Sequence, residues 1–376
     1  MTKNFISLFS GVEDHVGNIV KKIKNKSDKI IVFGAGYCLS MVFELCQIMD
    51  VSICAIVDNN EQKWNKKIRG VAVISLKDVI ARGYDLPILI STSHTEEILR
   101  QIKESGYRGE VFYLPKPAYY KNTIYGLEYI ERNEERFSQA YEALEDDISR
   151  EVFLGVLKHN ISLDNKFYDD IEKHEIDGYF GTSLYQNRTS EVLVDVGAFN
   201  GDTIAEFMRS GRFGYKKIYA FEPDVNNFNL LKQSVTEKSD IVVINAGLGE
   251  QCAKLRFVMG GGVSSRVDEE GEDYINIETI DHFFDGEYPT FIKMDIEGAE
   301  RAALLGGRNV IGNCTPTLAI SAYHKAEDLF DLIELIREIN KGYKIYLRHT
   351  FYYQTVRYQP DVIIYALNEG AGYEVK

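Results

Sequence analysis

The sequence predicts an α/β fold with two parts, each built around a mostly parallel sheet that is flanked by helices. Short runs rich in Val, Ile and Leu alternate with stretches of helical period along the 376-residue chain. This is the pattern of repeated strand–helix–strand units. Two of the runs, residues 29–33 and 192–196, end in a glycine turn that opens a helical stretch. In open parallel sheets, ligands bind beside such turns, at the carboxyl ends of the strands.

Three segments are expected along the chain. They are a smaller N-terminal Rossmann-like α/β domain (residues 1–118), a helical connector (119–185) and a larger α/β domain (186–376). Pro115 and Pro117 mark the end of the first domain. The connector is rich in Glu and Tyr and amphipathic, so we expect its helices to pack beside the larger sheet and line its substrate side. Tyr179 and Phe180 should belong to that wall.

The N-terminal domain carries an incomplete dinucleotide-binding pattern. Its strands are predicted at residues 29–33, 51–57, 86–91 and 110–114, and its helices before residue 27 and at 41–49, 74–83 and 95–106. The turn after the first strand reads Gly34-Ala-Gly36, but Leu39 stands where G-x-G-x-x-G has its third glycine. With Val57-Asp58-Asn59, this domain resembles nucleotide-binding-like domains attached to polysaccharide-biosynthesis enzymes. The resemblance implies nucleotide-sugar or substrate docking. The alternative is a structural part that packs against the other domain or a second subunit, which leaves a homodimer open.

The larger domain continues the alternation and closes with a hairpin. Its strands are predicted at residues 192–196, 218–221, 241–245, 255–259, 274–280, 291–294, 317–321, 343–347 and 361–367, and its main helices at 203–210, 226–235 and 327–341. The last two strands should form an antiparallel hairpin on an otherwise mostly parallel sheet. The glycine-rich insert at residues 260–273 is interpreted as a mobile loop near the site.

The turn after residues 192–196 favours a positively charged ligand. Carboxylates flank its glycines, in the order Asp195, Gly197, Ala198, Asn200, Gly201, Asp202. A diphosphate needs bare backbone amides and a helix N-terminus, and two nearby negative charges oppose it. S-adenosylmethionine fits instead, because its sulfonium and amino groups are positive and it has no phosphate. The alternative is that Asp195 and Asp202 only cap the turn and the helix.

A further acid and the third strand extend this cofactor prediction. Glu222 follows the second strand roughly 20 residues beyond the turn, where an acidic side chain can accept from both ribose hydroxyls. Asn245 and Ala246 end the third strand, and the adenine is expected beside them.

The chemistry is expected where residues 291–294 end. Asp295, Glu297 and Glu300 follow this strand, while His324 and His349 follow two others. Methyl transfer from a sulfonium to an oxygen needs an aligned acceptor and a group that takes the hydroxyl proton. A neutral imidazole suits this task, so His324 or His349 is the candidate base, with Asp295 orienting it or holding the acceptor. Alternatively, Asp295 and Glu297 could bind a divalent metal that activates the hydroxyl. No complete octahedral set is present, so no metal site is predicted.

Composition excludes several partners. The net charge of −14 opposes duplex nucleic acid and anionic membranes, and no basic patch interrupts it. The five cysteines form no CxxC pair and no set with His at metal-ligand spacing, so reduced thiols are expected. The sequence has no signal peptide and no run approaching the ~18 apolar residues of a membrane span. A cytoplasmic protein without membrane insertion is therefore expected.

Four motifs together resemble the FkbM family of methyltransferases. They are Asp195 to Thr203 (DVGAFNGDT), Phe221-Glu222-Pro223, Lys293 to Glu300 (KMDIEGAE) and Tyr323-His324. The resemblance spans about residues 191–367 and implies a class I methyltransferase fold, S-adenosylmethionine as donor, and O-methylation of a hydroxyl on a sugar, glycan or polyketide. It places Asp195, Gly197 and Glu222 at cofactor positions and Asp295 and Glu297 on the active-site strand.

The leading prediction is an S-adenosylmethionine-dependent O-methyltransferase in a polysaccharide or secondary-metabolite pathway. Its acceptor would be a small molecule or glycan, a nucleotide-linked sugar being one form. N-methylation stays open. One alternative is an NAD-dependent sugar oxidoreductase that uses the turn at Gly34. The other is a binding or scaffold module whose pocket has lost its activity.

Overall fold

The computed structural model describes residues 4–115, 123–185, 189–212, 214–236, 238–258, 266–267, 273–284, 288–350 and 361–368. The chain forms two compact units. Of the described residues, unit 1 comprises those within 4–137 and 154–170, and unit 2 comprises those within 138–153, 171–350 and 361–368. The division falls inside α6 (Glu134–Glu142) and α7 (Asp147–Ser162), which both belong to the predicted connector.

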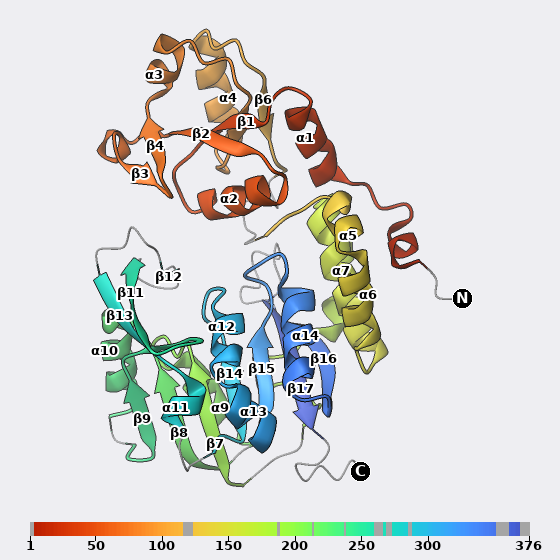
Figure 1. Ribbon diagram of the computed structural model, residues 1–376, viewed down its shortest axis with the longest axis vertical. Coiled ribbons are helices and arrows are strands. Elements are labelled where there is room, and N and C mark those ends of the chain that lie inside the picture. Colours follow the sequence, from red (N-terminus) through yellow and green to blue (C-terminus); the bar gives the residue numbers. More distant parts are fainter. Residues whose placement is uncertain are drawn as a thin grey trace. The chain divides into compact units, whose positions relative to one another are not determined.

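Unit 1 contains a six-stranded sheet with the strand order β3-β4-β2-β1-β5-β6, visible in Figure 1 in red to orange. Its elements are η1 (Phe5–Phe9), α1 (His15–Lys24), β1 (Lys29–Phe33), α2 (Leu39–Ile48), β2 (Ser52–Val57), η2 (Glu61–Lys63), β3 (Lys67–Ile68), β4 (Val71–Ile74), α3 (Leu76–Ala81), β5 (Ile88–Ile90), α4 (Thr95–Glu104), β6 (Val111–Tyr113), α5 (Leu127–Arg132) and α8 (Lys166–Asp169).

Alternate side chains of β1 pack against helices on the two faces of this sheet. Ile30 and Val32 belong to one apolar cluster with residues of α1 and α2, whereas Ile31 and Phe33 belong to another with residues of α3 and α4. The four predicted strands are present as β1, β2, β5 and β6. The prediction missed the hairpin of β3 and β4, because both strands are short and Ile74 was assigned to the following helix.

Unit 2 contains a seven-stranded sheet with the order β16-β17-β15-β14-β7-β8-β9. The elements of this unit that follow α7 are η4 (Glu172–His174), β7 (Glu191–Val196), α9 (Asp202–Arg209), β8 (Tyr215–Phe221), α10 (Val225–Ser234), β9 (Ile241–Ile244), β10 (Gly247–Leu248), β11 (Ala253–Val258), β12 (Arg266–Val267), β13 (Asp273–Glu278), α11 (Ile280–Phe283), β14 (Phe291–Met294), α12 (Glu300–Leu305), α13 (Arg308–Cys314), β15 (Thr317–Ser321), α14 (Asp328–Ile339), β16 (Tyr343–Thr350) and β17 (Asp361–Asn368).

The pairing confirms a mostly parallel sheet with an antiparallel C-terminal hairpin. β7 lies between β14 and β8 and is parallel to both. β17 is antiparallel to its two neighbours, β15 and β16. As a result, the carboxyl ends of β7, β8, β14 and β15 lie at one edge of the sheet, where ligands of this fold bind.

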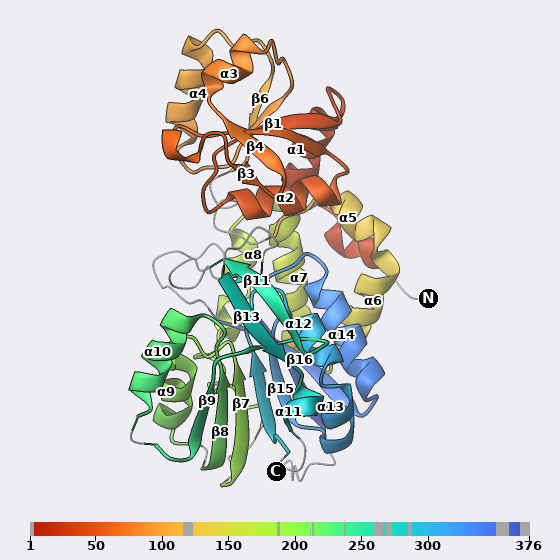
Figure 2. The ribbon, with the colours of Figure 1, turned by 60° about the vertical axis from the view of Figure 1, so that its left-hand side comes forward.

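Helices flank the sheet of unit 2. Leu193, Ile218 and Phe291 share one apolar cluster with Ile204 and Phe207 of α9 and with residues of the segment 176–185. Because side chains alternate along a strand, Val192, Val194 and Val196 lie on the opposite face of the sheet. Figure 2 shows α12, α13 and α14 beside β15 and β16, and these three helices also contact one another.

A separate four-stranded sheet in unit 2 has the order β10-β13-β11-β12. Most of the glycine-rich insert, which the sequence predicts to be a mobile loop, lies outside the described residues. Within the insert, only Arg266 and Val267, which form β12, and Asp273, which begins β13, are described. All five cysteines are free thiols, as expected. Within the part of the chain that the structure describes, no helix is both long and apolar enough to cross a membrane.

Candidate functional site

The glycine turn after β7 passes closely beside β14. Gly197 has φ +78°, and a Cβ there would collide with the carbonyl oxygen of Asp295. Gly201, with φ +92°, leads into α9 and faces the side chains of Ser234 and Leu231. Both positions need glycine because the backbone is left-handed and the space is already filled.

The amides of this turn donate to groups within the protein. Gly197 and Ala198 donate to the carbonyl oxygen of Phe221 at 3.0 Å, and Phe199 donates to Glu222 Oε2 at 2.9 Å. Gly201 donates to Ala198, and Asp202 donates to Asn200 Oδ1. A diphosphate site requires several backbone amides that point at the ligand. The turn therefore suits a ligand without phosphate, which agrees with the cofactor predicted from the sequence.

Glu222 joins the turn to the end of β8. Its side chain is buried, and its oxygens accept from the amides of Phe199 and Asp224, both at 2.9 Å. Burial raises the pKa of Glu222 to about 7, although these two amides oppose the shift. The side chain of Asn227 also donates to Glu222. Because a carboxylate has about four lone-pair sites, these three donors leave capacity for about one ribose hydroxyl.

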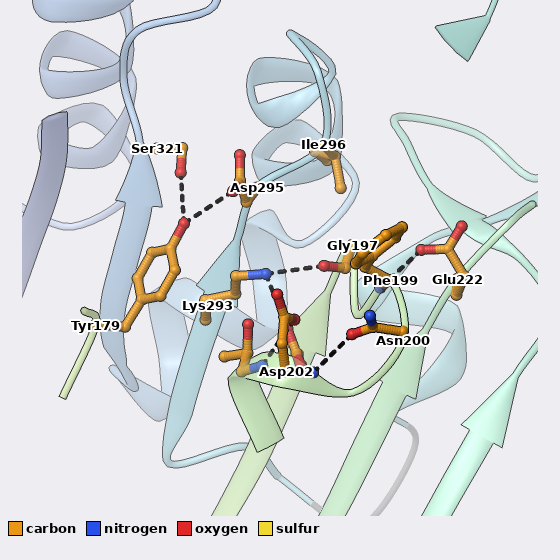
Figure 3. Close-up of polar contacts among 12 residues, drawn as sticks. Tyr179, Gly197, Phe199, Asn200, Asp202, Glu222, Lys293, Asp295, Ile296 and Ser321 are labelled. Carbon is orange, nitrogen blue, oxygen red and sulfur yellow. Dashed lines mark hydrogen bonds and ion pairs between the residues drawn. The ribbon is translucent and has the colours of Figure 1, made fainter. Parts of the chain in front are cut away.

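The residue that follows β9 is hydrogen-bonded to the residues that follow β8. Asn245 Nδ2 donates to the carbonyl oxygens of Glu222 and Pro223, at 2.9 and 3.1 Å, and Ala246 is buried directly after it. The structure thus gathers the cofactor residues predicted from three separate motifs along one side of the glycine turn, as Figure 3 shows for the turn and Glu222.

Asp195 forms a buried ion pair that the sequence analysis did not foresee. Lys293 Nζ lies 3.1 Å from Asp195 Oδ1 and donates to the carbonyl oxygen of Gly197 at 2.8 Å. The two side chains are 0% and 2% exposed. Burial raises the pKa of Asp195 to about 6, and Lys293 opposes this shift. Since a lysine balances its charge, Asp195 supports the turn from within and contributes little of the negative field predicted there.

Asp202 and Asn200 organise the start of α9. Asp202 is exposed, and its Oδ1 accepts from the amide of Thr203 at 2.8 Å. Asn200 accepts from the amide of Asp202, while Ala198 is fully buried behind the turn. The alternative prediction that Asp202 caps this helix is wrong, because the capping position of α9 is Gly201, no side chain caps the helix, and Asp202 is its first residue.

Asp295 is the centre of a polar network at the carboxyl end of β14. Its Oδ2 accepts from the Tyr179 hydroxyl at 3.0 Å, and its Oδ1 accepts from the Tyr323 hydroxyl at 3.2 Å (Figure 3 shows the contact with Tyr179). His324 Nε2 lies 3.3 Å from Oδ1. Burial alone would raise the pKa of Asp295, but His324 and Lys293 hold it below its usual value. Asp295 is therefore ionised at neutral pH, with 29% of its side chain exposed.

His324 is held between carboxylates. Its Nδ1 lies 3.0 Å from Glu300 Oε1, and its Nε2 faces Asp295 and, at 4.0 Å, Glu297 Oε2. Burial lowers the pKa of His324, but Glu300, Asp295 and Glu297 raise it to about 10. The expectation of a neutral imidazole at this position is therefore wrong, because three acids stabilise the protonated ring.

His349 does not join this network. It lies inside β16, rather than after it, and β17 and β15 separate that strand from β14. Burial, together with His174 and Arg348, lowers the pKa of His349 to about 4. The prediction that both histidines and Asp295 converge is wrong for His349. The reason is that β17 lies between β16, which contains His349, and β15, which precedes His324.

A tethered segment before β7 carries Tyr179 to the site. The carbonyl oxygen of Tyr179 accepts from the hydroxyls of Tyr185 and Tyr365, at 2.7 and 2.8 Å. The neighbouring amide of Phe180 donates to half-buried Glu206 at 2.9 Å. Tyr179 is thus part of the wall around Asp295, and its hydroxyl also lies 3.0 Å from Ser321 Oγ.

Replacing Tyr179 with Phe should lower the free energy of unfolding of unit 2 by about 1–3 kcal/mol, because the partly buried carboxylate of Asp295 loses a hydroxyl donor. The measurement is urea unfolding of the full chain. Tyr288→Phe removes a hydroxyl from a side chain that is 54% exposed and serves as the matched control. Equal unfolding midpoints for both variants would contradict the importance of this hydrogen bond.

Two charged residues of the site were missed. Lys293 had a signal: a lysine within the apolar strand Phe291–Met294 requires a buried partner of opposite charge. Asp361 begins β17 close to Asp295 and Glu297. Burial and these two acids raise its pKa to about 7. Asp361 had no local signal, because its neighbours come from strands distant in sequence.

One group of potential metal ligands lies within this network. Donor atoms of Asp295, Glu300 and His324 all lie within 4.8 Å of one another. A histidine that binds a metal must offer a neutral ring nitrogen. Here the protonated ring of His324 offers no free nitrogen to a metal and offsets the negative charge of one of the two acids.

The N-terminal glycine turn differs from a dinucleotide site in its use of Asp58. Asp58 Oδ2 accepts from the amide of Ala35 at 2.8 Å and from Lys63 Nζ at 3.2 Å. Lys63 also donates to the carbonyl oxygen of Ala35 at 2.7 Å. In dinucleotide-binding domains, the acid after the second strand binds a ribose. In this chain it fastens the turn, and nucleotide binding by unit 1 stays a prediction.

Comparison with protein-family models gives two matches. Residues 195–345 match the methyltransferase FkbM domain, and residues 26–111 match the C2185-like N-terminal domain. The first match contains the glycine turn, Glu222, Asp295 and His324. Tyr179 and Asp361 lie outside it. No curated protein matches the chain.

Solved structures with the same fold include a methyltransferase FkbM from Methylobacillus flagellatus KT. It is 23% identical, with a TM-score of 0.59, and the similarity covers 96% of this chain and 97% of that one. An rRNA methylase from Streptococcus thermophilus is 15% identical, with a TM-score of 0.32, over 49% of this chain and 89% of its own. The first likeness confirms the class I methyltransferase fold.

Proposed function

Because residues 195–345 match the methyltransferase FkbM domain, we propose that this protein is an S-adenosylmethionine-dependent O-methyltransferase that acts on a hydroxyl of a sugar or glycan. One observation carries the proposal. Glu222 on one side of the glycine turn and the network of Asp295 on the other side form a donor subsite and an acceptor subsite that flank one turn.

The donor subsite comprises the turn, Glu222 and the end of β9. When bound there, S-adenosylmethionine supplies a methyl group on a positively charged sulfur. Glu222 would accept from a ribose hydroxyl, and Asn245 and Ala246 would border the adenine. The amides of the turn donate within the protein, which supports a cofactor without phosphate.

Replacing Glu222 with Gln should weaken the binding of S-adenosylhomocysteine about 10- to 100-fold, because a charge-assisted hydrogen bond to the ribose becomes a neutral one. Titration calorimetry on the full chain measures this. Glu338→Gln changes an acid that is 65% exposed and pairs with Arg308, and serves as the matched control. If wild type does not bind, or if Glu222→Gln binds as wild type does, the donor subsite is assigned wrongly.

The acceptor subsite centres on Asp295. The carboxylate already accepts from Tyr179 and Tyr323 and faces His324, which leaves about one lone-pair site for an acceptor hydroxyl. We assign Asp295 to hold that hydroxyl and to take its proton as the oxygen is methylated. His324 positions Asp295 and balances its charge, and Glu297, 47% exposed, lies on the outer rim.

The acidic residues around the acceptor subsite also limit which acceptors can bind there. Asp295 and Glu297 lie close enough to Asp361 to raise the pKa of its carboxyl group, together with burial. Such a rim opposes an acceptor whose phosphates lie beside the reacting atom. It accommodates neutral hydroxyls, so the reacting part should be a sugar ring remote from any diphosphate.

A test of the acceptor uses S-adenosylmethionine with a panel of neutral sugars, amino sugars and nucleotide sugars. Mass spectrometry of the products identifies the methylated atom. A methyl ether on a sugar supports the proposal. Methylation of amino nitrogens alone, with the hydroxyls untouched, would overturn the assignment as an O-methyltransferase.

A further inference from the structure

A second group of metal-ligating side chains lies outside the site described above. Cys252 precedes β11, Glu278 ends β13, and His282 lies on α11. One donor atom from each of these three residues lies within 4.8 Å of the other two. None of the residues takes part in the donor or acceptor subsites, so their convergence needs a separate explanation.

The backbone fixes this arrangement. β11 and β13 are antiparallel with Ala253 opposite Ile277, so Cys252 continues the ladder toward Glu278. Leu248 of β10 also pairs with Glu278, from the other side. His282 lies four residues after Glu278, at the start of the helix that follows this strand. Three neighbouring elements therefore hold the donors in place.

The distances match those of a tetrahedral zinc site. Cys252 Sγ lies 3.5 Å from Glu278 Oε2, and His282 Nδ1 lies 3.2 Å from the same oxygen. Zinc binds sulfur at about 2.3 Å and nitrogen or oxygen at about 2.0–2.2 Å, so its adjacent ligand atoms are roughly 3.3–3.6 Å apart. An ion could enter with only small side-chain shifts.

The donor types select the class of metal. Magnesium and calcium prefer oxygen ligands, whereas a thiolate, an imidazole and a carboxylate together suit zinc. The site is also accessible. Cys252 is exposed, and 73% of the His282 side chain and 32% of the Glu278 side chain are exposed. A fourth position remains for water or for a further ligand.

We propose that Cys252, Glu278 and His282 bind one zinc ion. The ion fastens the connection between β10 and β11 to β13 and α11. Phe283, next to His282, packs on Phe221 with ring centroids 4.9 Å apart, and Phe221 directly precedes Glu222. Zinc at this place therefore braces the wall of unit 2 behind the donor subsite.

The test is titration of the full chain with zinc chloride after treatment with a chelator. We expect one ion per chain, with a dissociation constant on the order of 1 μM or below. Cys252→Ser and His282→Asn should each weaken binding at least about tenfold. Cys54→Ser replaces an exposed cysteine of unit 1 and should bind zinc as wild type does.

Cobalt provides a second readout that is independent of methyl transfer. A cobalt-loaded wild type should show a thiolate-to-metal charge-transfer band in the near ultraviolet. The band should be absent in Cys252→Ser and present in Cys54→Ser. Circular dichroism verifies that the variants are folded. Absence of stoichiometric zinc binding by wild type, or equal binding by wild type, Cys252→Ser and His282→Asn, would overturn the proposal.

Discussion

Replacing Asp295 with Asn should lower the rate of methyl transfer at least about 100-fold while leaving the affinity for S-adenosylhomocysteine nearly unchanged. A group that removes a proton in the transition state typically contributes 10²- to 10⁴-fold. The amide retains an oxygen that can accept from Tyr179 or Tyr323. It loses the negative charge that faces His324 and the capacity to take up a proton.

The measurement is the turnover number with the acceptor that reacts fastest in the panel, together with calorimetry of S-adenosylhomocysteine. Asp240→Asn makes the same change at an exposed position before β9 and should behave as wild type. A rate within about threefold of wild type would remove Asp295 from the reaction. Parallel losses of rate and cofactor affinity would indicate a general structural role instead.

Replacing Lys293 with Met should lower the free energy of unfolding by about 3–5 kcal/mol at neutral pH, because Asp195 would remain buried without its partner. Combining this change with Asp195→Asn removes the unpaired charge and should recover part of the loss. Urea unfolding of the two variants and wild type measures the effect. Equal stability of Lys293→Met and wild type would contradict a structural role for the pair.

The same variant has a predictable pH dependence. In the folded wild type, the pKa of Asp195 is about 6, above the ~3.9 of an exposed Asp. Without Lys293 it should rise further, so the folded variant binds a proton that the unfolded chain releases. Its stability therefore falls as the pH rises through this range. The difference from wild type should be small in acid and largest at neutral pH.

The local pattern of the sequence determined most of the framework. The runs of Val, Ile and Leu predicted β1, β7, β14 and β15, and β1, β14 and β15 have the predicted bounds. The sequence also predicted the C-terminal hairpin and the glycine turn. The turn contains left-handed backbone conformations, which glycine adopts most easily. Glu222 and Asp295 could be identified as candidate site residues because each directly follows a strand in a recognisable motif.

The charge states of Asp195 and His324, and the charged residues that lie near them, depended on the tertiary structure. A carboxylate beside a glycine turn suggests a negative field, but whether Asp195 contributes to that field depends on Lys293 of a neighbouring strand. His324 has an ordinary sequence context, and only the approach of Glu300, Asp295 and Glu297 raises its pKa to about 10.

The sequence by itself therefore determined where β7, β8, β14 and β15 end and which motifs follow them, because hydrophobic period and glycine geometry are local properties. Only the tertiary structure decided that Tyr179 reaches Asp295, that β17 separates His349 from the site, and that Asp361 joins it. Strand order and burial bring together residues distant in sequence, and electrostatic interactions depend on those distances and on the exclusion of water.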